Sequence, residues 1–544
     1  RDHIEYALRQ KDIEGGVKLK LAGPLEFFED MDKLGGPRHT YTGELYFTAH
    51  RGTYTSQAKV KKSNRTGEAL LRETEIWNAI ASRLVDSYEY PSVEMEQLWK
   101  KLLLNQFHDI LPGSSIARVY EDALAEYAKL MEGCKKLRTD ALDVLTANTG
   151  DSNSREDHQA KSVSFYNSLG FERTVVVDLP EEFETGAKQS LITIPALSAV
   201  TVTPDVEIRG LDVASVSLID GMFVFENGKI RAAVNSSGEI TSYVLKDGSQ
   251  SREFAAAPMN HLEMYKEVIC KEGLSAVLKV TGIIGKSRYE QYIRLDAGST
   301  VVEIRMKVEW NELHRLLKVS FPVSVMAEEG INEIQFGYIK RPTHRSRAYD
   351  QERFEVCNHR YSALCDGAHG AAVLNDCKYG ISMNENRLEL TLLTAAACPE
   401  MRADNGTQEF RYGFTAWEGT FEDSDVVRKG IEFNTPVTSH PGNSILAGTG
   451  MFYCSRENVI LETVKQAEDG SGDIIMRLYE SKKEDCVASV KMPMIEGADC
   501  FDCDLLENIQ SRLIADKNAL PIHFGAFEIK TIRIRKKEKN DFTE

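Results

Sequence analysis

The stretch LLLNQFHDILPGSSI, residues 102–116, separates two helical patterns and sets the organisation of the first third of the chain. Before it, Ser92 is the candidate N-cap of a helix over residues 93–107, and Pro112-Gly113 breaks that helix. After it, apolar residues recur at steps of three and four from residue 116 to 145, which predicts a long helix with one apolar face. A similar period at residues 66–84 completes a predicted three-helix bundle over residues 61–150.

The region before the bundle shows mixed signals. Residues 1–8 and 25–34 are typical of helices, whereas 17–21 and 43–50 are typical of short strands. Sixty residues of this kind bury too little to form a core, so we expect the end of a larger α/β domain. The chain starts with Arg1 rather than methionine, which is expected of a fragment or a processed product.

From residue 162 onward the hydrophobic period changes to two. Strands are expected at residues 280–284, 289–295, 300–308 and 388–393, and Asn-Gly, Ser-Gly and Asp-Gly pairs mark turns throughout the region. The polar stretch 148–161 is expected to be a linker. We predict a first β-segment at 162–210, a large β-sandwich domain at 211–434 and a C-terminal β-domain at 435–544. The fold class expected is therefore multidomain α+β, with antiparallel β-sandwich domains following the bundle.

Composition excludes several classes of function. The 544 residues carry 66 basic and 83 acidic side chains, so the net charge is 66 − 83 = −17. An acidic surface repels nucleic acid and anionic lipid, so neither is an expected partner. The sequence has no apolar run long enough to span a membrane and no visible leader, which favours a cytoplasmic protein. Ten scattered cysteines fit reduced thiols.

His108 and Asp109 are the densest polar pair in an apolar context. A histidine just past a helix end is either a surface or capping residue favoured by the helix dipole, or a metal ligand. Asp109 could accept hydrogen bonds from a polar ligand. A second polar run, 375–380, is either a hairpin turn capped by Asp376 or a loop that reaches toward the same region.

These segments resemble a known family. LLLNQFHDILPGSSI is similar to the signature of glycoside hydrolase family 38, the class II α-mannosidases, in particular their cytosolic, vacuolar and bacterial branch. The sequence also resembles the family, in the same order, in GELYFTAHRGTYTSQAKVKKSNR (43–65), VSFYNSLGFERTVVVDLP (163–180), LNDCKYGISMNENRLELTLL (374–393) and FGAFEIKTIRI (524–534). The resemblance implies that residues 1–60 are the last part of a catalytic α/β barrel.

The same resemblance implies a retaining α-mannosidase that uses one zinc ion and two carboxyl groups about 5 Å apart. It assigns His108 as a zinc ligand, and Asp109 and Tyr54 as contacts to a mannose-containing oligosaccharide. The nucleophile, the acid/base and a His-x-Asp ligand pair are expected upstream, because none of the twelve histidines begins a His-x-Asp triplet. We therefore expect no catalytic residue in this chain, weak or absent zinc binding, and no hydrolysis by the chain alone.

Two other hypotheses stay open on the sequence. One is a non-catalytic β-rich module that binds glycans or scaffolds a partner, and the other is a site assembled with a barrel from a separate chain. The bundle face around His108 is expected to expose an apolar margin, which would favour association into a homo-oligomer.

Overall fold

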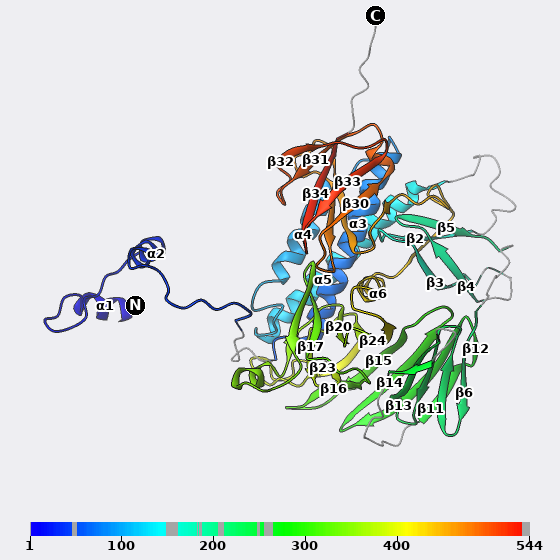
Figure 1. The fold of residues 1–544 in the computed structure, drawn as a ribbon, viewed down its shortest axis with the longest axis horizontal. Coiled ribbons are helices and arrows are strands. Elements are labelled where there is room, and N and C mark those ends of the chain that lie inside the picture. The colour runs from blue at the N-terminus through cyan, green and yellow to red at the C-terminus, as the bar shows by residue number, and fades with distance from the viewer. Residues whose placement is uncertain are drawn as a thin grey trace, which may run out of the picture. The chain divides into compact units, whose positions relative to one another are not determined.

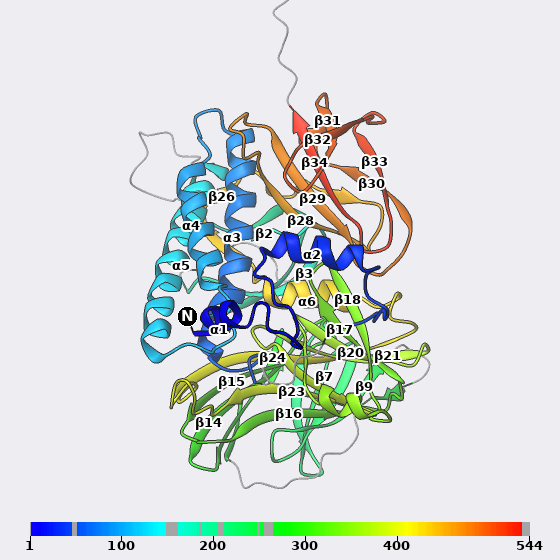
Figure 2. The same ribbon diagram turned by 90° about the vertical axis from the view of Figure 1, so that its left-hand side faces the viewer.

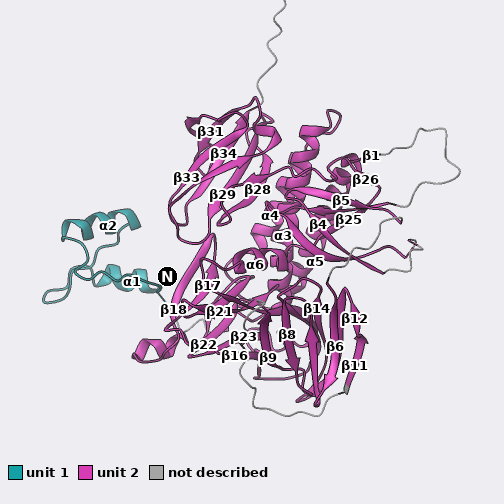
Figure 3. Cartoon of the chain, turned by 45° about the vertical axis from the view of Figure 1, so that its right-hand side comes forward, with its two compact units in different colours: residues 1–48 teal, residues 49–544 magenta. Residues whose placement is uncertain are grey.

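The computed structural model describes residues 2–45, 52–147, 162–181, 183, 188–204, 212–246, 251–254 and 265–535. Two compact units divide the chain at residue 48 (Figure 3). Within the described part of the first unit lie two helices, α1 (Asp2–Arg9) and α2 (Pro24–Lys33), which agree with the helices predicted there. The strand predicted at residues 17–21 is wrong, because that segment is irregular and exposed. Residues 43–45 are also outside any strand, and 46–50 lie outside the described residues.

Three long helices form the bundle of the second unit. They are α3 (Ala58–Leu84), α4 (Ser92–Asn105) and α5 (Ala117–Leu145), which run side by side in Figures 1 and 2. The predicted stripe of α5 is buried from Tyr120 to Leu145, although Ile116 itself is 60% exposed. Ser92 is not the N-cap of α4: it is the first helical residue, and Pro91 occupies the cap position without a side-chain bond.

Most of the remaining chain is antiparallel sheet, which confirms the multidomain α+β class. The largest sheet has nine strands, in the spatial order β11 (Tyr265–Cys270), β13 (Ser275–Ile284), β14 (Ser287–Asp296), β15 (Val302–Trp310), β24 (Gly406–Glu418), β21 (His369–Asn375), β20 (Tyr361–Cys365), β17 (Glu329–Ile334) and β18 (Gly337–Pro342). All four core strands predicted between residues 280 and 393 exist, three in this sheet and the fourth as β23 (Arg387–Thr394) in another sheet.

Two smaller sheets share one apolar core with the nine-stranded sheet. The first has the order β10 (Ser251–Glu253), β9 (Ile240–Lys246), β8 (Ile230–Val234), β7 (Met222–Glu226), β6 (Ala214–Ile219) and β12 (Glu272–Gly273). The second has the order β16 (Leu316–Pro322), β23 (Arg387–Thr394), β22 (Gly380–Asn384) and β19 (Val356–Cys357). Their alternating buried residues form the interior of a sandwich.

The C-terminal sheets pack on the bundle. One has the order β28 (Val459–Gln466), β29 (Ile474–Glu480), β34 (Ile529–Arg535), β31 (Asp499–Cys503) and β32 (Ile509–Leu513), and the other β27 (Tyr453–Cys454), β30 (Cys486–Lys491) and β33 (Ala519–Phe524). Their core includes Trp77 and Ile80 of α3 and Leu142 of α5. The C-terminal parts of α3 and α5 therefore share a hydrophobic interior with the last β-domain, whereas the three helices pack on one another around a separate core.

The first β-segment is closed by chain from far downstream. Strand β25 (Thr438–Pro441) pairs with β2 (Val163–Asn167), which also pairs with β5 (Ser198–Val202). Strand β26 (Asn443–Ser444) pairs with β1 (Thr146–Ala147), and β3 (Arg173–Asp178) forms a hairpin with β4 (Gln189–Ile194). Helix α6 (Val426–Asn434) precedes this return. Residues 435–444 are thus structurally part of the first β-segment, although they open the predicted C-terminal domain.

A buried carboxyl inside the bundle gives a pH-dependent prediction. Glu75 is 6% exposed and accepts a 2.7 Å hydrogen bond from the Trp99 indole nitrogen. Burial raises its pKa from 4.5 to about 7, so the folded state takes up a proton over this range and loses stability as the pH rises through it. We expect Glu75→Gln to raise the free energy of unfolding by about 2 kcal/mol at about pH 8, and to change it little below about pH 4.5.

Urea unfolding of the two proteins at both pH values measures this difference. The matched control is Glu96→Gln, because the Glu96 side chain on α4 is 55% exposed. A gain of equal size at both pH values would contradict the assignment to Glu75 ionisation.

Candidate functional site

The motif at residues 102–116 forms the turn between helices α4 and α5. Helix α4 ends at Asn105, two residues earlier than predicted, and Gln106 occupies its C-cap position. The side chains of His108 and Asp109 are 75% and 55% exposed, with His108 Nε2 3.4 Å from Asp109 Oδ2. Gln106 rather than His108 occupies the cap position of α4, and the His108 imidazole lies largely in solvent beside the Asp109 carboxylate.

Local bonds fix the orientation of Asp109. The Ser114 hydroxyl donates a 2.9 Å hydrogen bond to Asp109 Oδ1, and the Tyr120 hydroxyl donates one of 3.3 Å to the Asp109 carbonyl oxygen. The Phe107 and His108 rings lie 4.2 Å apart between centroids. The second carboxylate oxygen, on the side of His108, is thus presented by a held turn rather than by a loose loop.

Lys61 joins this turn to the segment that carries Tyr54. Its ammonium group donates to the carbonyl oxygens of Ser56, Leu111 (2.9 Å) and Pro112 (3.4 Å). Gly113, at φ +90°, lies so close to Ser56 that a Cβ atom there would be 2.8 Å from the Ser56 backbone and side chain. Tyr54 is half-buried in the same turn as Ser56. The structure therefore brings the turn at 52–56 against the predicted site.

The large β-domain also contributes to this arrangement. Asp404, in the loop before β24, accepts a 2.7 Å hydrogen bond from the backbone N–H of Ala58 at the first turn of α3. Burial lowers the pKa of Lys61 and raises that of Asp404, although each charge favours the ionised form of the other. A helix terminus and an anchoring cation are thus held by a residue more than 300 positions away.

Gln106 of the motif enters a second polar network. Its amide nitrogen donates to Glu68 Oε1 (2.8 Å) and to Asn64 Oδ1 (3.0 Å) on α3. The Tyr379 hydroxyl accepts from Arg65 Nε (3.3 Å) and from the Asn64 amide (3.4 Å). Burial raises the pKa of Glu68. The loop that carries Tyr379 is therefore linked, through α3, to the base of the motif.

The loop at residues 375–380 contradicts one of the two predictions made for it and agrees with the other. The turn at 375–380 is held by Asn375, whose side-chain oxygen accepts from the backbone N–H groups of Cys377 (3.2 Å) and Lys378 (2.7 Å), and Asp376 does not cap it. The loop is largely buried and contacts α3 through Tyr379. It therefore reaches the polar network around Gln106, as expected from the alternative that this loop extends toward the region of His108.

The donor set for a metal is incomplete in the described part of the chain. His108 and Asp109 offer one imidazole and one carboxylate, and tetrahedral zinc needs more donors held together. No group of three His, Cys, Asp or Glu side chains with ligand geometry occurs among the described residues. These residues can contribute ligands to a zinc site, but they do not close one.

The Lys61 anchor gives a testable prediction. Lys61→Met should speed amide hydrogen exchange in residues 52–56 and 109–113, because three backbone carbonyls lose their shared donor, each at a cost of about 1 kcal/mol or more. Lys59→Met is the control, since Lys59 lies two residues before Lys61 on the same helix and is exposed. Unchanged exchange in both segments of Lys61→Met would show that the anchor is dispensable.

Sequence reasoning did not find Lys61, Asn64 or Gln106. Lys61 lies in the run KVKK, which reads as a solvated basic face, yet it is 3% exposed. The signal available was the polar spacing of residues 61, 64, 65 and 68, which places four side chains on one face of the helix. The apolar margin predicted around the motif is present: Leu103, Leu104, Phe107 and Ile116 are all more than half exposed.

Three family models match the chain in consecutive segments. They are the alpha mannosidase middle domain at residues 48–145, the glycosyl hydrolases family 38 C-terminal domain at 253–402, and the family's C-terminal beta sandwich domain at 458–532. Alpha-mannosidase 2C1 of Homo sapiens is 32% identical over 97% of this chain and 54% of its own length. The alpha-mannosidase of Saccharomyces cerevisiae is 29% identical over 94% of this chain and 50% of its own.

Solved structures share the fold. An alpha-mannosidase from Enterococcus faecalis V583 superposes with a TM-score of 0.77 over 96% of this chain and 72% of its own, at 12% identity. The chain spans about half the length of the curated relatives it matches. Within the described ranges no helix is both long and apolar enough to cross a membrane.

Proposed function

The chain belongs to glycoside hydrolase family 38, of which it carries the middle and C-terminal domains, and on this premise we propose that it is part of a retaining, zinc-dependent α-mannosidase. The substrate class is an oligosaccharide with α-linked terminal mannose. The observation that carries the proposal is the exposed His108–Asp109 pair, presented on a turn that Lys61, Ser114 and Tyr120 hold in place.

Each side chain has a role that its environment permits. The exposed imidazole of His108 supplies one zinc ligand. Asp109 Oδ2, the oxygen not engaged by Ser114, accepts hydrogen bonds from mannose hydroxyls. Tyr54 offers a half-buried ring and a phenol hydroxyl to the sugar from the neighbouring turn. A bound zinc ion supplies Lewis-acid polarisation and orientation of the sugar.

The covalent chemistry requires groups that this chain does not provide. Retaining glycosidases use one carboxylate as nucleophile and one carboxyl as acid/base, about 5 Å apart on either side of the glycosidic bond. We propose that both are contributed by residues outside this chain, together with the other zinc ligands. The chain alone is therefore expected to be inactive, and it depends on a barrel domain as its structural partner.

The test is an α-mannosidase assay on the 544-residue chain, with and without an upstream barrel region from an active relative, together with zinc quantification. We expect turnover of a chromogenic α-mannoside and about one bound zinc only when the barrel region is joined. Turnover by the isolated chain near that of a full-length relative would overturn the assignment of the catalytic residues. Failure of the joined protein, correctly folded and zinc-loaded, would overturn the proposed activity.

A further inference from the structure

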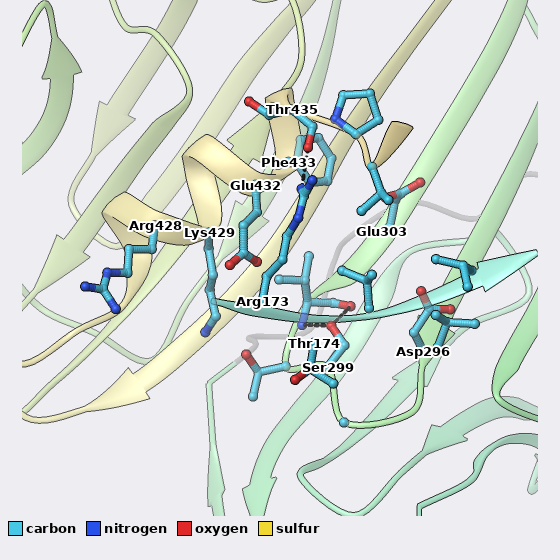
Figure 4. A pocket seen from close by; sticks show the side chains of 18 of the residues that line it. Arg173, Thr174, Asp296, Ser299, Glu303, Arg428, Lys429, Glu432, Phe433 and Thr435 are labelled. Carbon is cyan, nitrogen blue, oxygen red and sulfur yellow. Dashed lines mark hydrogen bonds between the residues drawn. The ribbon is translucent and has the colours of Figure 1, made fainter. Parts of the chain in front are cut away.

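A cleft of about 820 Å³ lies where the first β-segment, helix α6 and the turn between β14 and β15 meet (Figure 4). Its lining comes from β3, from α6 and the residues just after it, and from residues 294–303. Neither His108, Asp109 nor Tyr54 lines it. A cleft formed by three segments that are distant in the sequence, with polar groups converging on it, has the general features of a ligand site.

Arg173 of β3 has two of the three buried, unpartnered nitrogens found among the described residues that line this cleft; the third is Nε of Arg428. Arg173 is 4% exposed, and one terminal nitrogen, Nη1, donates a 2.5 Å hydrogen bond to the Thr435 carbonyl oxygen. Its Nε and Nη2 are buried and have no hydrogen-bond partner among the described residues. These two nitrogens form one edge of the planar guanidinium, the edge that binds two oxygens side by side. Leaving both donors buried and unbonded is costly, so the edge is expected to meet a ligand.

Most other charges in the cleft are already paired. Ion pairs join Lys429 to Asp425 (2.7 Å), Arg294 to Asp296 (2.6 Å), Arg411 to Glu303 (3.2 Å) and Arg428 to Glu457 (3.7 Å). Glu432 of α6 lines the cleft beside Arg173 (Figure 4). Its carboxyl accepts no hydrogen bond from the residues that the structure describes. Burial raises the pKa of Glu432, and the charge of Arg173 opposes that rise. The cleft thus presents a free donor edge and a free acceptor with little excess charge of either sign.

We propose that this cleft binds a neutral sugar unit, a mannose residue of an oligosaccharide, between Arg173 and Glu432. Adjacent sugar hydroxyls can accept from the Arg173 edge and donate to the Glu432 carboxylate at once, which satisfies both groups. An anion would satisfy Arg173 but would face Glu432, and of the other cations in the lining only the exposed Lys229 lacks an ion pair among the described residues. The choice of mannose rests on the proposed function, whereas the choice of a neutral polyol rests on the cleft.

Hydrogen bonds rather than ring stacking would hold this sugar. The guanidinium of Arg428 lies 4.9 Å from the centre of the Phe171 ring, and that of Arg411 lies 4.6 Å from the Phe433 ring. Cations therefore cover one face of each ring. We expect this site to bind a free monosaccharide weakly. Its contribution would be to increase the affinity of the protein for a branched or extended glycan that also binds elsewhere.

The experiment is ligand-detected NMR and calorimetry on the 544-residue chain with an α-linked mannotriose, a maltotriose and inorganic phosphate as probes. Arg173→Lys keeps the charge but removes the two-donor edge, and it should weaken mannotriose binding about tenfold or more. Thr174→Trp adds bulk from an exposed position of β3 that lines the cleft, and it should block binding without emptying the core. Arg288→Lys, on the exposed face of β14, is the matched control and should bind as the unaltered chain does.

Each outcome has a definite meaning. Loss of mannotriose binding in both cleft variants but not in the control supports the proposal. No mannotriose binding, or binding that neither variant changes, overturns it. Phosphate binding that Arg173→Lys removes assigns the cleft to an anion and also overturns it. Maltotriose bound in place of mannotriose, with the same dependence on Arg173, overturns the mannose assignment alone. None of these results depends on hydrolysis, which the assay of the barrel-joined protein tests separately.

Discussion

Replacing His108 by alanine in the barrel-joined enzyme is expected to release the zinc ion and to lower kcat/KM about a thousandfold or more. Losing one ligand weakens a site that holds the metal only through several donors together, and the metal's contribution to the transition state is several kcal/mol. A thousandfold loss corresponds to about 4 kcal/mol, which is within that contribution. Zinc quantification and steady-state kinetics on the same preparation measure both effects.

The same change should leave the fold intact. The His108 side chain is 75% exposed and its nearest contacts are the Phe107 ring and the Asp109 carboxylate, so the free energy of unfolding of the isolated chain should change by less than about 0.5 kcal/mol. His523→Ala is the matched control, because His523 is also exposed and lies 3.2 Å from an aspartate, Asp485. A His108→Ala enzyme that keeps its zinc and its turnover would remove His108 from the site.

Local pattern was enough to predict the elements that bury one face. The stripe of α5 and the alternation of β13, β14 and β15 each bury the residues that the period selects, because a single amphipathic element carries its own signal. The prediction of a strand at residues 17–21 was wrong for the complementary reason. Alternation over five residues has little meaning where no partner strand buries either face, and those residues are exposed.

Contacts between distant segments could not be predicted in this way. Nothing within residues 435–444 indicates that β25 pairs with β2, since any antiparallel partner of suitable length would satisfy its hydrogen bonds. The candidate site shows the same difference between local and distant signals. His108 and Asp109 were found from a local motif, whereas Lys61 becomes part of the site only because α3 brings it to Leu111 and Pro112. Arg173 gave no signal in a strand that reads as RTVVVD.

Trp77→Ala is expected to lower the free energy of unfolding by about 4 kcal/mol, the largest stability effect we predict. Trp77 is fully buried on α3, its ring lies edge-on to that of Tyr166 at 5.3 Å between centroids, and its indole nitrogen donates to Glu73 Oε1 at 3.4 Å. Truncation would leave a cavity among side chains of the bundle and of two β-segments, which cannot all move inward together. Urea unfolding followed by circular dichroism measures the loss.

The position of Trp77 also makes the change a test of how the second unit unfolds. Leu104→Ala is the control, because Leu104 on α4 is 66% exposed and its truncation removes little buried surface. Trp77→Phe, which keeps a ring against Tyr166, should fall between the two. If helix and sheet signals unfold together in the unaltered chain and separately in Trp77→Ala, the shared core is what couples the bundle to the C-terminal domain. Trp77 is the largest fully buried side chain in the core that the bundle shares with the C-terminal sheets. If the urea midpoint of Trp77→Ala equals that of Leu104→Ala, this core is therefore not packed as described.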